Sequence, residues 1–528
     1  MSATITRRRV AVGAERDGFG QLLHAEWTKF RTVRGWVIGI IVAGPLIIAV
    51  NFIPGGQCGG IQTNSQASPG GPGCTLTLGP TGQAVTDSFY FVHQPLASRG
   101  SITVRLTSMS GSYSPGGAAS QTARAAPQPW SKAGIIIKTS TRPGSAYAAM
   151  MVTGDHGVRM QWDYIQDTSG LAGAVSATAP RWLRLTRSGD TISGYDSADG
   201  THWSRVGTAT LAGLPATVQA GLFAASPNSS NVTSQSATGS SASGLSTQAT
   251  AAFGHITLQG MPGGRWSGTD IGGPNRGNQP QGGGYRRAGG ALTVTGSGDI
   301  APAVPGQAGG EDLTVAVFLV GTFAGLIAVI VVATMFITAE YRRGLIRTTL
   351  TASPRRGRVL AAKAIVLGSV TFATGLVAAA AAVILGTQLA RSRVYVFPVS
   401  WLTELRMVVG TAALVAVAAV LALAVGTMLR RSAAAVTVVI VAIVLPYLLG
   451  VVSVLPAGAA DWVLRITPAA AFAVQQALPQ YSQVTALYSP GGGGGYFPLA
   501  PWAGFAVLCG WTALAVALAL VLLRRRDV

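Results

Sequence analysis

Charged residues are scarce in this chain, and the places where they are missing are its most informative feature. They make up only 11% of the 528 residues. Six long segments contain no Asp, Glu, Lys or Arg: 36–53, 313–339, 364–390, 407–429, 432–460 and 466–523. A helix needs roughly 20 apolar residues to cross the hydrocarbon core of a bilayer. The pattern excludes an ordinary water-soluble protein and predicts an α-helical polytopic membrane protein.

The sequence also lacks the signatures of several enzyme classes. It has no Gly-x-x-x-x-Gly-Lys-Ser/Thr loop, so we expect it neither to bind nor to hydrolyse ATP itself. Its five His are scattered rather than spaced as metal ligands. Residues 27–310 contain no Glu, which argues against the carboxylate pair of a glycoside hydrolase. We therefore expect no catalytic residue, no metal and no cofactor bound by this chain.

Cysteine is rare, with three residues in all. Cys58 and Cys74 follow the first apolar segment, where an outer location would permit oxidation. They form a candidate disulfide, and two free thiols are the alternative. Cys509 lies within the last apolar segment, where we expect it to pack as a small apolar side chain.

The charge that is present explains the net charge of +20. Basic residues gather in 1–35, 340–363, 430–431 and 524–526, which alternate membrane crossings place on one side. Excess Lys and Arg mark the cytoplasmic side of a membrane protein. We therefore predict a multi-pass protein of the cell membrane with cytoplasmic N- and C-termini and with residues 55–312 extracytoplasmic. Topology accounts for the charge without a nucleic-acid partner, and Arg391, Arg393 and Arg406 are the outer exceptions.

The segments give a set of predicted boundaries. Six transmembrane helices are expected at 36–54, 313–339, 360–389, 407–429, 432–456 and 499–523. The cytoplasm would hold a basic tail at 1–17, a loop at 340–359 and a short tail at 524–528. Residues 461–487 contain two prolines in an apolar context and are expected to form outer re-entrant helices, with an ordinary surface loop as the alternative.

Residues 18–35 have the spacing of an amphipathic helix. Such a helix would lie in the membrane interface with Trp27 near the lipid headgroups. A plain extension of the first transmembrane helix is the alternative. The residues that define this interfacial helix are Leu23, Glu26, Trp27, Lys29 and Phe30.

The segment between the first two transmembrane helices changes character. Residues 86–260 contain many short runs of period two, such as 101–109 and 158–164, separated by turn residues. This pattern predicts an antiparallel, all-β sandwich inserted between the first two helices. Residues 55–85 and 261–312 are rich in Gly and Pro and are expected to be a linker and a flexible tether.

The runs Phe89-Tyr-Phe-Val-His-Gln-Pro-Leu96 and Gly194-Tyr-Asp-Ser-Ala-Asp-Gly-Thr-His-Trp203 carry a first resemblance. Residues 86–260 resemble the concanavalin-like jelly-roll domains, which bind sugars, cleave glycans or mediate contacts. The remaining carboxylates at Asp155, Asp163 and Asp167 do not replace the missing Glu pair. Sugar stacking or core packing are the two interpretations of Trp130, Trp162, Trp182 and Trp203.

Two cytoplasmic segments carry a second resemblance. The run Leu22-Leu-His-Ala-Glu-Trp-Thr-Lys-Phe-Arg-Thr-Val-Arg34 and the loop from Ala339 to Ala364 are similar to actinobacterial permeases of the type-two ATP-binding-cassette exporters. The resemblance implies a separate ATP-binding subunit that holds ATP and Mg, and a second copy or a related permease chain. It also implies that the loop docks on that subunit. The residues that we assign to this coupling loop are Glu340, Tyr341, Arg342, Arg343, Gly344, Arg347 and Thr348.

Two functions follow as hypotheses. The first is the permease subunit of an ATP-driven exporter, with a path suited to an amphipathic or lipid-like substrate because we expect the spans to lack charged residues. The second is a membrane-anchored protein that binds or senses extracytoplasmic glycan. Membrane lipid is a partner in both, and cell-wall glycan is a candidate ligand of the sandwich. Positive-inside anchoring is the simpler interpretation of the loop arginines.

Overall fold

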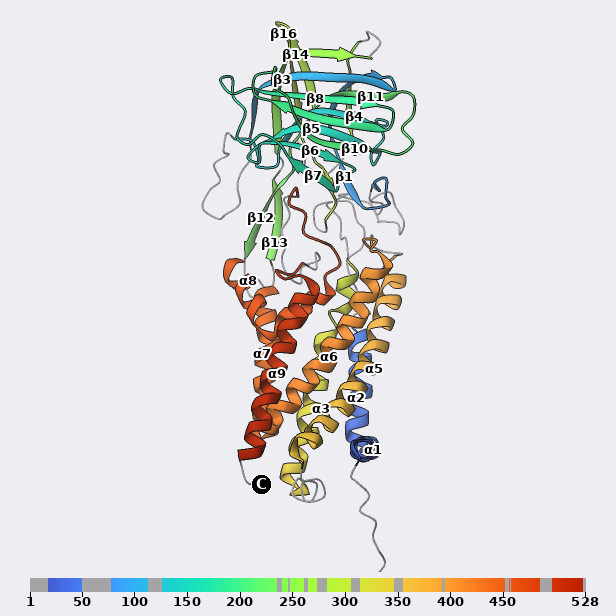
Figure 1. Cartoon of the computed structure of the whole chain (residues 1–528), viewed down its shortest axis with the longest axis vertical. Coiled ribbons are helices and arrows are strands. Elements are labelled where there is room, and N and C mark those ends of the chain that lie inside the picture. Colours follow the sequence, from blue (N-terminus) through green and yellow to red (C-terminus); the bar gives the residue numbers. More distant parts are fainter. Residues whose placement is uncertain are drawn as a thin grey trace, which may run out of the picture.

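The computed structural model describes residues 18–49, 77–112, 126–234, 240–245, 247–260, 265–272, 283–304, 314–345, 355–391, 395–451, 455, 457–484 and 496–525. Two parts are evident. A bundle of long helices forms one end of the molecule and a β-sandwich forms the other (Figure 1). Cys58, Cys74, Arg347 and Thr348 lie outside the described residues, so the candidate disulfide and the end of the coupling loop are outside them too.

Apolar composition and length account for the helices of the bundle. Five helical segments are long and apolar enough to cross a membrane, and a sixth crossing results if the bent pair α1–α2 counts as one. Such helices satisfy their backbone hydrogen bonds internally, which a bilayer requires. The helices are α1 (Phe19–Thr32), α2 (Arg34–Ala49), α3 (Thr322–Arg342), α5 (Arg356–Ala390), α6 (Trp401–Leu429), α7 (Ser432–Val451), α8 (Ala457–Ile466) and α9 (Pro501–Arg525).

Two short 3₁₀ helices complete the bundle at its sandwich end. Helix η3 (Val315–Leu319) precedes α3, and η4 (Pro468–Gln475) follows α8. Every residue of η4 is buried, and the helix packs against α6, α7 and α9. The side-chain amide of Gln475 donates to the hydroxyls of Thr322 and Thr411, at 3.3 and 3.2 Å. The segment after α7 therefore turns back into the bundle, within the range 461–487.

Large aromatic side chains mark the same end of the bundle. Trp401 begins α6, Trp502 lies in the first turn of α9, and Trp462 lies on α8. Their exposed fractions are 70%, 56% and 63%. Exposed Trp at helix ends is typical of the membrane–water interface, where the indole contacts both phases. These residues place one membrane surface just below the sandwich.

Two antiparallel sheets of seven strands form the sandwich. The first sheet has the order β10 (Ser204–Thr210), β9 (Thr191–Ser197), β8 (Arg181–Ser188), β3 (Arg99–Ser112), β14 (Gln248–Gln259), β17 (Ala291–Gly296) and β16 (Gly284–Ala288). The second has the order β15 (Ser267–Ile271), β2 (Phe89–Leu96), β11 (Val218–Ala225), β4 (Lys132–Lys138), β5 (Tyr147–Thr153), β6 (Val158–Trp162) and β7 (Gln166–Ser169).

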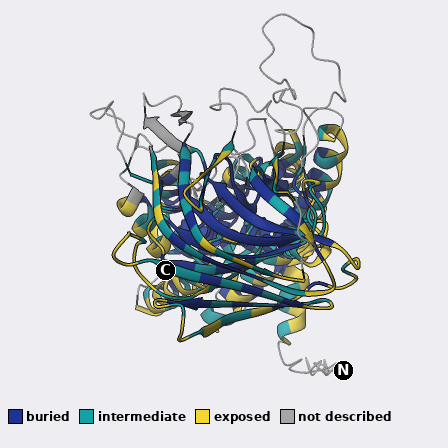
Figure 2. Cartoon of the chain, turned by 90° about the horizontal axis from the view of Figure 1, so that it is seen from above, coloured by how far each residue is buried: buried dark blue, intermediate teal, exposed yellow. Residues whose placement is uncertain are grey.

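Alternation of side chains explains the core between the sheets. Ile102, Val104 and Leu106 of β3 point inward with Leu183 and Leu185 of β8, and all five are fully buried. The intervening residues point outward, as period-two strands require. From above, buried residues follow the strands and exposed residues concentrate in the turns (Figure 2). The Asp199–Gly200 turn joins β9 to β10, and Gly200 adopts φ +79° there.

The sandwich extends farther along the chain than its sequence pattern predicts. Strands β15, β16, β17 and β18 (Ile300–Pro302) fall in 261–312, where composition predicts a tether. The sequence signal for β15 and β16 is weak because both strands are short and contain Gly. Strand β15 pairs with the remote strand β2, and β16 pairs with β17, which in turn pairs with β14. Tertiary pairing overrides local composition here.

A separate two-stranded ribbon covers the outer face of the second sheet. Strand β1 (Val85–Asp87) pairs with β18, and the ribbon contributes Val85 and Ile300 to a second apolar cluster. That cluster contains Phe89, Phe91 and Tyr147 on the outer face of the sheet. The ribbon explains why all residues of β4 and β5 are buried although the strands lie in an outer layer.

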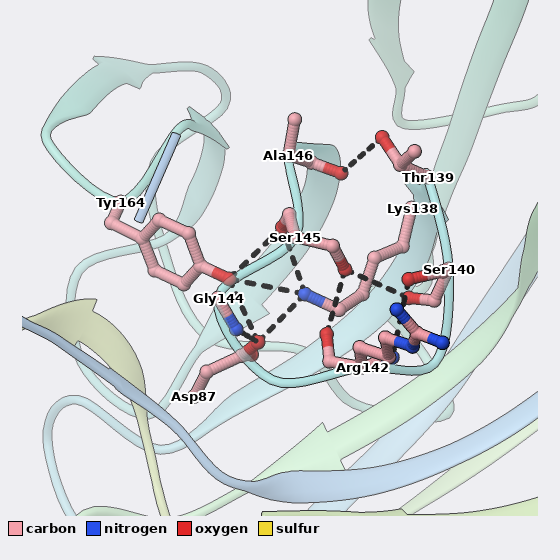
Figure 3. A network of polar contacts seen from close by, with 9 residues as sticks. All are labelled: Asp87, Lys138, Thr139, Ser140, Arg142, Gly144, Ser145, Ala146 and Tyr164. Atoms are coloured by element: carbon pink, nitrogen blue, oxygen red, sulfur yellow. Dashed lines mark hydrogen bonds and ion pairs between the residues drawn. The ribbon is translucent and has the colours of Figure 1, made fainter. Parts of the chain in front are cut away.

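Buried charges fix the ribbon to the sheet. The ammonium of Lys138 donates to Asp87 Oδ2 at 2.7 Å, and the Tyr164 hydroxyl and the Gly144 N–H donate to the same oxygen at 2.7 Å each (Figure 3). Burial lowers the pKa of Lys138 and the charge of Asp87 opposes that shift. On the same strand, Lys132 donates to Asp299 at 2.6 Å. These are buried structural ion pairs, in which one oxygen of each carboxylate, Asp87 Oδ1 and Asp299 Oδ2, has no hydrogen-bond partner among the described residues.

We expect Lys138→Met to destabilise the sandwich by about 3–5 kcal/mol, because it leaves the Asp87 carboxylate buried without its counter-charge. The free energy of unfolding can be followed by urea-dependent proteolysis of the sandwich in the full-length protein. Arg142→Met, at an exposed site in the β4–β5 turn, is the control and should change stability by less than about 0.5 kcal/mol. Equal stability of the two variants would contradict the role given to the pair.

The sandwich contacts the bundle through loops at the helix ends. Phe397, between α5 and α6, packs with Ala84 and Ala303, and Val484, after η4, packs with Ala301 and Val304. The Gln483 side-chain amide donates to the carbonyl of Ile165 at 2.9 Å. The sandwich is thereby joined to the bundle at the end where η4 lies. The hairpin β12 (Ser229–Ser234) and β13 (Ser240–Leu245) extends from it toward α8 (Figure 1).

Candidate functional site

Four charged side chains meet at the bundle end opposite the sandwich. We name Glu26, Lys29, Glu340 and Lys363 the ion cluster. Glu26 and Lys29 come from α1, Glu340 from the last turn of α3, and Lys363 from the second turn of α5. Helix α1 lies across this end of the bundle at 78° to α2 (Figure 1), which brings its side chains against α3 and α5.

In the ion cluster, two ammonium groups are shared between two carboxylates. The Lys363 ammonium donates to Glu26 Oε2 at 2.7 Å and to Glu340 Oε1 at 2.6 Å. Lys29 also donates to Glu340 Oε1, and it lies 3.8 Å from Glu26. Each carboxylate therefore contacts both ammonium groups, and the cluster is neutral as a unit. The three helices are joined by charges rather than by apolar contact alone.

Burial makes these contacts decisive for the structure. Lys363 is fully buried, while Glu340 and Glu26 are 1% and 3% exposed. Buried charges carry a large desolvation cost that is offset only while every partner is in place. Glu340 Oε2 is buried without a hydrogen-bond partner among the described residues. Separation of α1 from α3 or α5 would leave an uncompensated charge, so the three elements are expected to move together.

Aromatic rings enclose the ion cluster on its bundle side. The Lys363 ammonium lies 4.9 Å from the ring centroid of Phe336, close enough for a cation–π contact. The Phe336 ring makes edge contacts with Phe30 and Trp36, at 5.9 and 4.9 Å between centroids. Phe30 is buried and Trp27 is exposed, so α1 presents Phe30 to the bundle and Trp27 to its surroundings. Leu23 also packs on the bundle core.

The helix end beside the ion cluster presents exposed residues. Helix α3 ends at Arg342, Arg343 caps it, and Gly344 adopts φ +69°, the left-handed conformation that commonly ends a helix. Arg342, Arg343 and Gly344 are exposed, whereas Tyr341 is half-buried with Arg430 of the α6 end 5.1 Å from its ring centroid. The exposed basic turn after α3 therefore lies directly beside the ion cluster.

The structure separates the residues predicted for the coupling loop into two groups. Glu340 was expected in a cytoplasmic loop but lies inside α3, buried in the ion cluster. Arg342, Arg343 and Gly344 are at the surface. In the described part of the coupling loop, Glu340 therefore holds the segment to the bundle, and the exposed residues from Arg342 to Gly344 are the ones available to a partner.

The predicted interfacial helix differs in a similar way. Its Glu26 was expected on a polar face toward water, yet it is buried against Lys363. The sequence analysis counted Lys363 among the basic residues of 340–363 without giving it a role, and the structure places it inside α5, where it is buried. In the sequence, Glu340 and Lys363 lie on either side of a short basic loop, and this spacing could have indicated that they pair. Glu26, the partner of Lys363 on α1, is more than 300 positions away in sequence and gives no such signal.

The ion cluster offers no chemistry beyond positioning. No group of His, Cys, Asp or Glu that could hold a metal occurs among the described residues. Its carboxylates are engaged by ammonium groups rather than aimed into a cavity. What the arrangement can do is transmit force, because a displacement of the exposed turn after α3 must carry α1 and α5 with it or break buried ion pairs.

Comparison with solved structures yields only weak likenesses. A GH43 protein from Bacillus licheniformis is 18% identical over 24% of this chain and 24% of its own length, with a TM-score of 0.17. A protein of unknown function from Saccharomyces cerevisiae is 17% identical over 36% of this chain and 84% of its own, with a TM-score of 0.22. Peanut lectin is 11% identical over 45% and 97%, with a TM-score of 0.16. These scores support no inference about the chain.

Family membership rests on a different finding. No curated protein matches the sequence at a significant level. A family model described as ABC-2 family transporter protein matches residues 158–528, which is more than half of the chain and includes α3 to α9. Members are the membrane component of a transporter whose ATP hydrolysis occurs in separate subunits, which implies an ATP-binding partner. The chain, a multi-pass membrane protein that also contains a β-sandwich domain, belongs to the ABC-2 family of transporter proteins.

Proposed function

We propose that this chain is the permease subunit of an ATP-driven exporter that moves an amphipathic or lipid-like substrate across the cell membrane. The ion cluster is the observation that carries the proposal. It joins α1, α3 and α5 at the same bundle end as the exposed Arg342–Gly344 turn. An exposed basic turn that is held by the ion cluster suits a docking site for a partner that changes its conformation.

In this proposal the ATP-binding subunit docks on the turn after α3 and on the residues that lead into α5. Closure of the partner around ATP would displace the turn, and the ion cluster would pass the displacement to α1 and α5. Such a shift requires the partner to bind one arrangement of the permease more tightly than the other. The docking end is then cytoplasmic, and the sandwich at the other end is extracytoplasmic.

The composition of the bundle helices supports the proposed substrate class. Away from the ion cluster, the described portions of α6, α7 and α9 that lie in the membrane present mainly Ala, Val, Leu and Thr. Intramembrane charge marks the sites of most ion-coupled carriers, so its scarcity favours an apolar path. Exposed apolar faces, such as Ile38, Ile41 and Val42 on α2, are available to lipid or to a second permease chain.

Transport can be tested with the purified chain and its ATP-binding subunit in sealed vesicles. We expect co-purification of the two proteins and ATP-dependent movement of a fluorescent phospholipid or an amphipathic dye. The vesicles should expose the ATP-binding subunit, and a hydrolysis-deficient partner is the control. Vesicles in which ATP hydrolysis never accelerates transport of any amphipathic probe would contradict the proposed substrate class. The alternative function, a membrane-anchored glycan-binding protein, gains no support, because a membrane anchor has no need of the ion cluster.

A further inference from the structure

The outer face of the first sheet gathers three arginines among aromatic side chains. Cross-strand register places Thr103, Arg184, Tyr195 and Arg205 in one row across β3, β8, β9 and β10, and Arg105 lies opposite Trp182 in the next row. Residues directly opposite each other share a face. Because Leu183, Leu185 and Ile192 point into the core, both rows point outward. We name the set Arg105, Trp182, Arg184, Tyr195, Trp203 and Arg205 the basic face.

The arginines of the basic face have no acidic partner. None of the three forms an ion pair with a carboxylate within the described residues. The carboxylates nearest to these arginines in sequence have other partners. Asp199 accepts from His202 Nδ1 at 2.7 Å and from the N–H groups of Thr201 and His202, and Asp190 accepts from the N–H groups of Gly213 and Leu214. Asp196 points inward and accepts from the Leu171 N–H. Within the described part of the chain, no carboxylate therefore pairs with the positive charge of this face.

Two contacts hold the central arginine in a fixed pose. The guanidinium of Arg184 lies 3.8 Å from the ring centroid of Trp203, and its Nε donates to the Thr103 hydroxyl at 3.0 Å. The Trp203 indole N–H is itself held by the Gly200 carbonyl at 3.1 Å. A stacked guanidinium loses little further freedom when it binds, and its planar fork matches carboxylate and phosphate oxygens.

The shape of the basic face selects an extended ligand. Neighbouring strands lie roughly 4.8 Å apart, so four strands spread the charges over about 14 Å of the sheet surface. Aromatic side chains, with one apolar face and a polar tip, are suited to contact with sugar rings as well as to packing. A strip of arginines interleaved with Trp and Tyr suits a chain of charged rings better than a small anion.

We propose that the basic face binds an anionic polysaccharide, in which carboxylates or phosphodiesters meet the arginines and sugar rings lie against the aromatic side chains. The choice of a polysaccharide over a nucleic acid, the other common polyanion, rests on the extracytoplasmic placement in the proposed function. The binding itself does not depend on transport. In the exporter this face would hold a polymer of the cell envelope beside the outlet of the bundle.

The test uses the full-length protein in detergent and measures binding to four immobilised polymers. Polygalacturonate supplies carboxylates, a phosphodiester-linked polysaccharide with a hexose in each repeat supplies phosphodiesters, dextran supplies uncharged rings, and double-stranded DNA supplies charge without a pyranose. We expect one or both acidic glycans to bind at least about tenfold more tightly than dextran and DNA, and to weaken between about 50 and 200 mM salt. The stronger of the two acidic arms identifies the charged group.

Substitutions distinguish binding by the basic face from non-specific attraction to the protein's overall positive charge. Arg105→Gln with Arg205→Gln should reduce affinity for the acidic glycan by about tenfold or more and lower the salt dependence. Arg142→Gln with Arg286→Gln removes the same charge at exposed sites, one on the other sheet and one at the far edge of the first, and should retain binding. Equal loss in both pairs, equal binding to DNA, or no binding to either acidic glycan would overturn the proposal. Transport assays would be unaffected by such a failure.

Discussion

Replacing Lys363 by Met is expected to give the largest loss of stability of any single substitution in the bundle. The change removes the ammonium that Glu26 and Glu340 share, and among the described residues it leaves Lys29 as the only ion-pair partner of the two buried carboxylates. Loss of one member of a buried ion network costs about 3–5 kcal/mol. A lower thermal unfolding midpoint in detergent, a lower yield of folded protein and loss of ATPase stimulation should appear together.

A second substitution distinguishes charge balance from loss of side-chain volume. In Glu26→Gln with Lys363→Met the ion cluster is again neutral, with one Lys and one Glu, and we expect part of the stability to return. Coupling between contacting charged residues is typically 0.5–3 kcal/mol. Arg358→Met, at an exposed site of the same helix, is the matched control. Additive effects of the two substitutions would show that the ion cluster does not act as a unit.

Charge reversal in the turn after α3 is expected to uncouple the transporter without unfolding it. Arg343 is exposed beside the ion cluster but is not part of it. Arg343→Glu with Arg347→Glu should weaken binding of the ATP-binding subunit by roughly tenfold or more, because reversed charge at an interface costs several kcal/mol. ATP turnover of the complex should fall toward that of the isolated partner.

The control for this result lies at the opposite end of the bundle. Arg391 is exposed after α5, on the side of the sandwich, and Arg391→Glu makes the same change of charge there. It should leave partner binding and ATP turnover unchanged, and all variants should elute as monodisperse protein. Unchanged turnover in the Arg343→Glu and Arg347→Glu variant would refute the role given to the turn, and loss of turnover in Arg391→Glu would refute its location.

The sequence predicts some parts of this molecule better than others, for physical reasons. Long charge-free segments predict membrane helices well because the signal is local and each segment must be apolar along its whole length. Period-two runs at 101–109 and 158–164 predict β3 and β6 for the same reason. Strands β15 to β18 are missed because pairing with β2, β14 and β1 creates them, and these partners are remote in the chain.

The candidate site shows the same limit more sharply. Glu26, Lys29 and Glu340 are visible in the sequence as residues near membrane helices, and their charge predicts a position in water. Their actual environment depends on Lys363, which enters from another helix and makes burial of Glu26 and Glu340 possible, while Lys29 stays partly exposed. Compensation between remote charges has no local pattern. The basic face was missed for a similar reason, since cross-strand register rather than sequence spacing assembles Arg105, Arg184 and Arg205.

The central claim is that the ion cluster and the turn beside it lie in the cytoplasm while the sandwich lies outside. Single cysteines at positions 343 and 142, in a chain whose own three cysteines are replaced, can be labelled with a membrane-impermeant thiol reagent. We predict that intact cells label position 142 at once and position 343 only after permeabilisation. Labelling of position 343 from outside intact cells, with position 142 protected, would contradict the account.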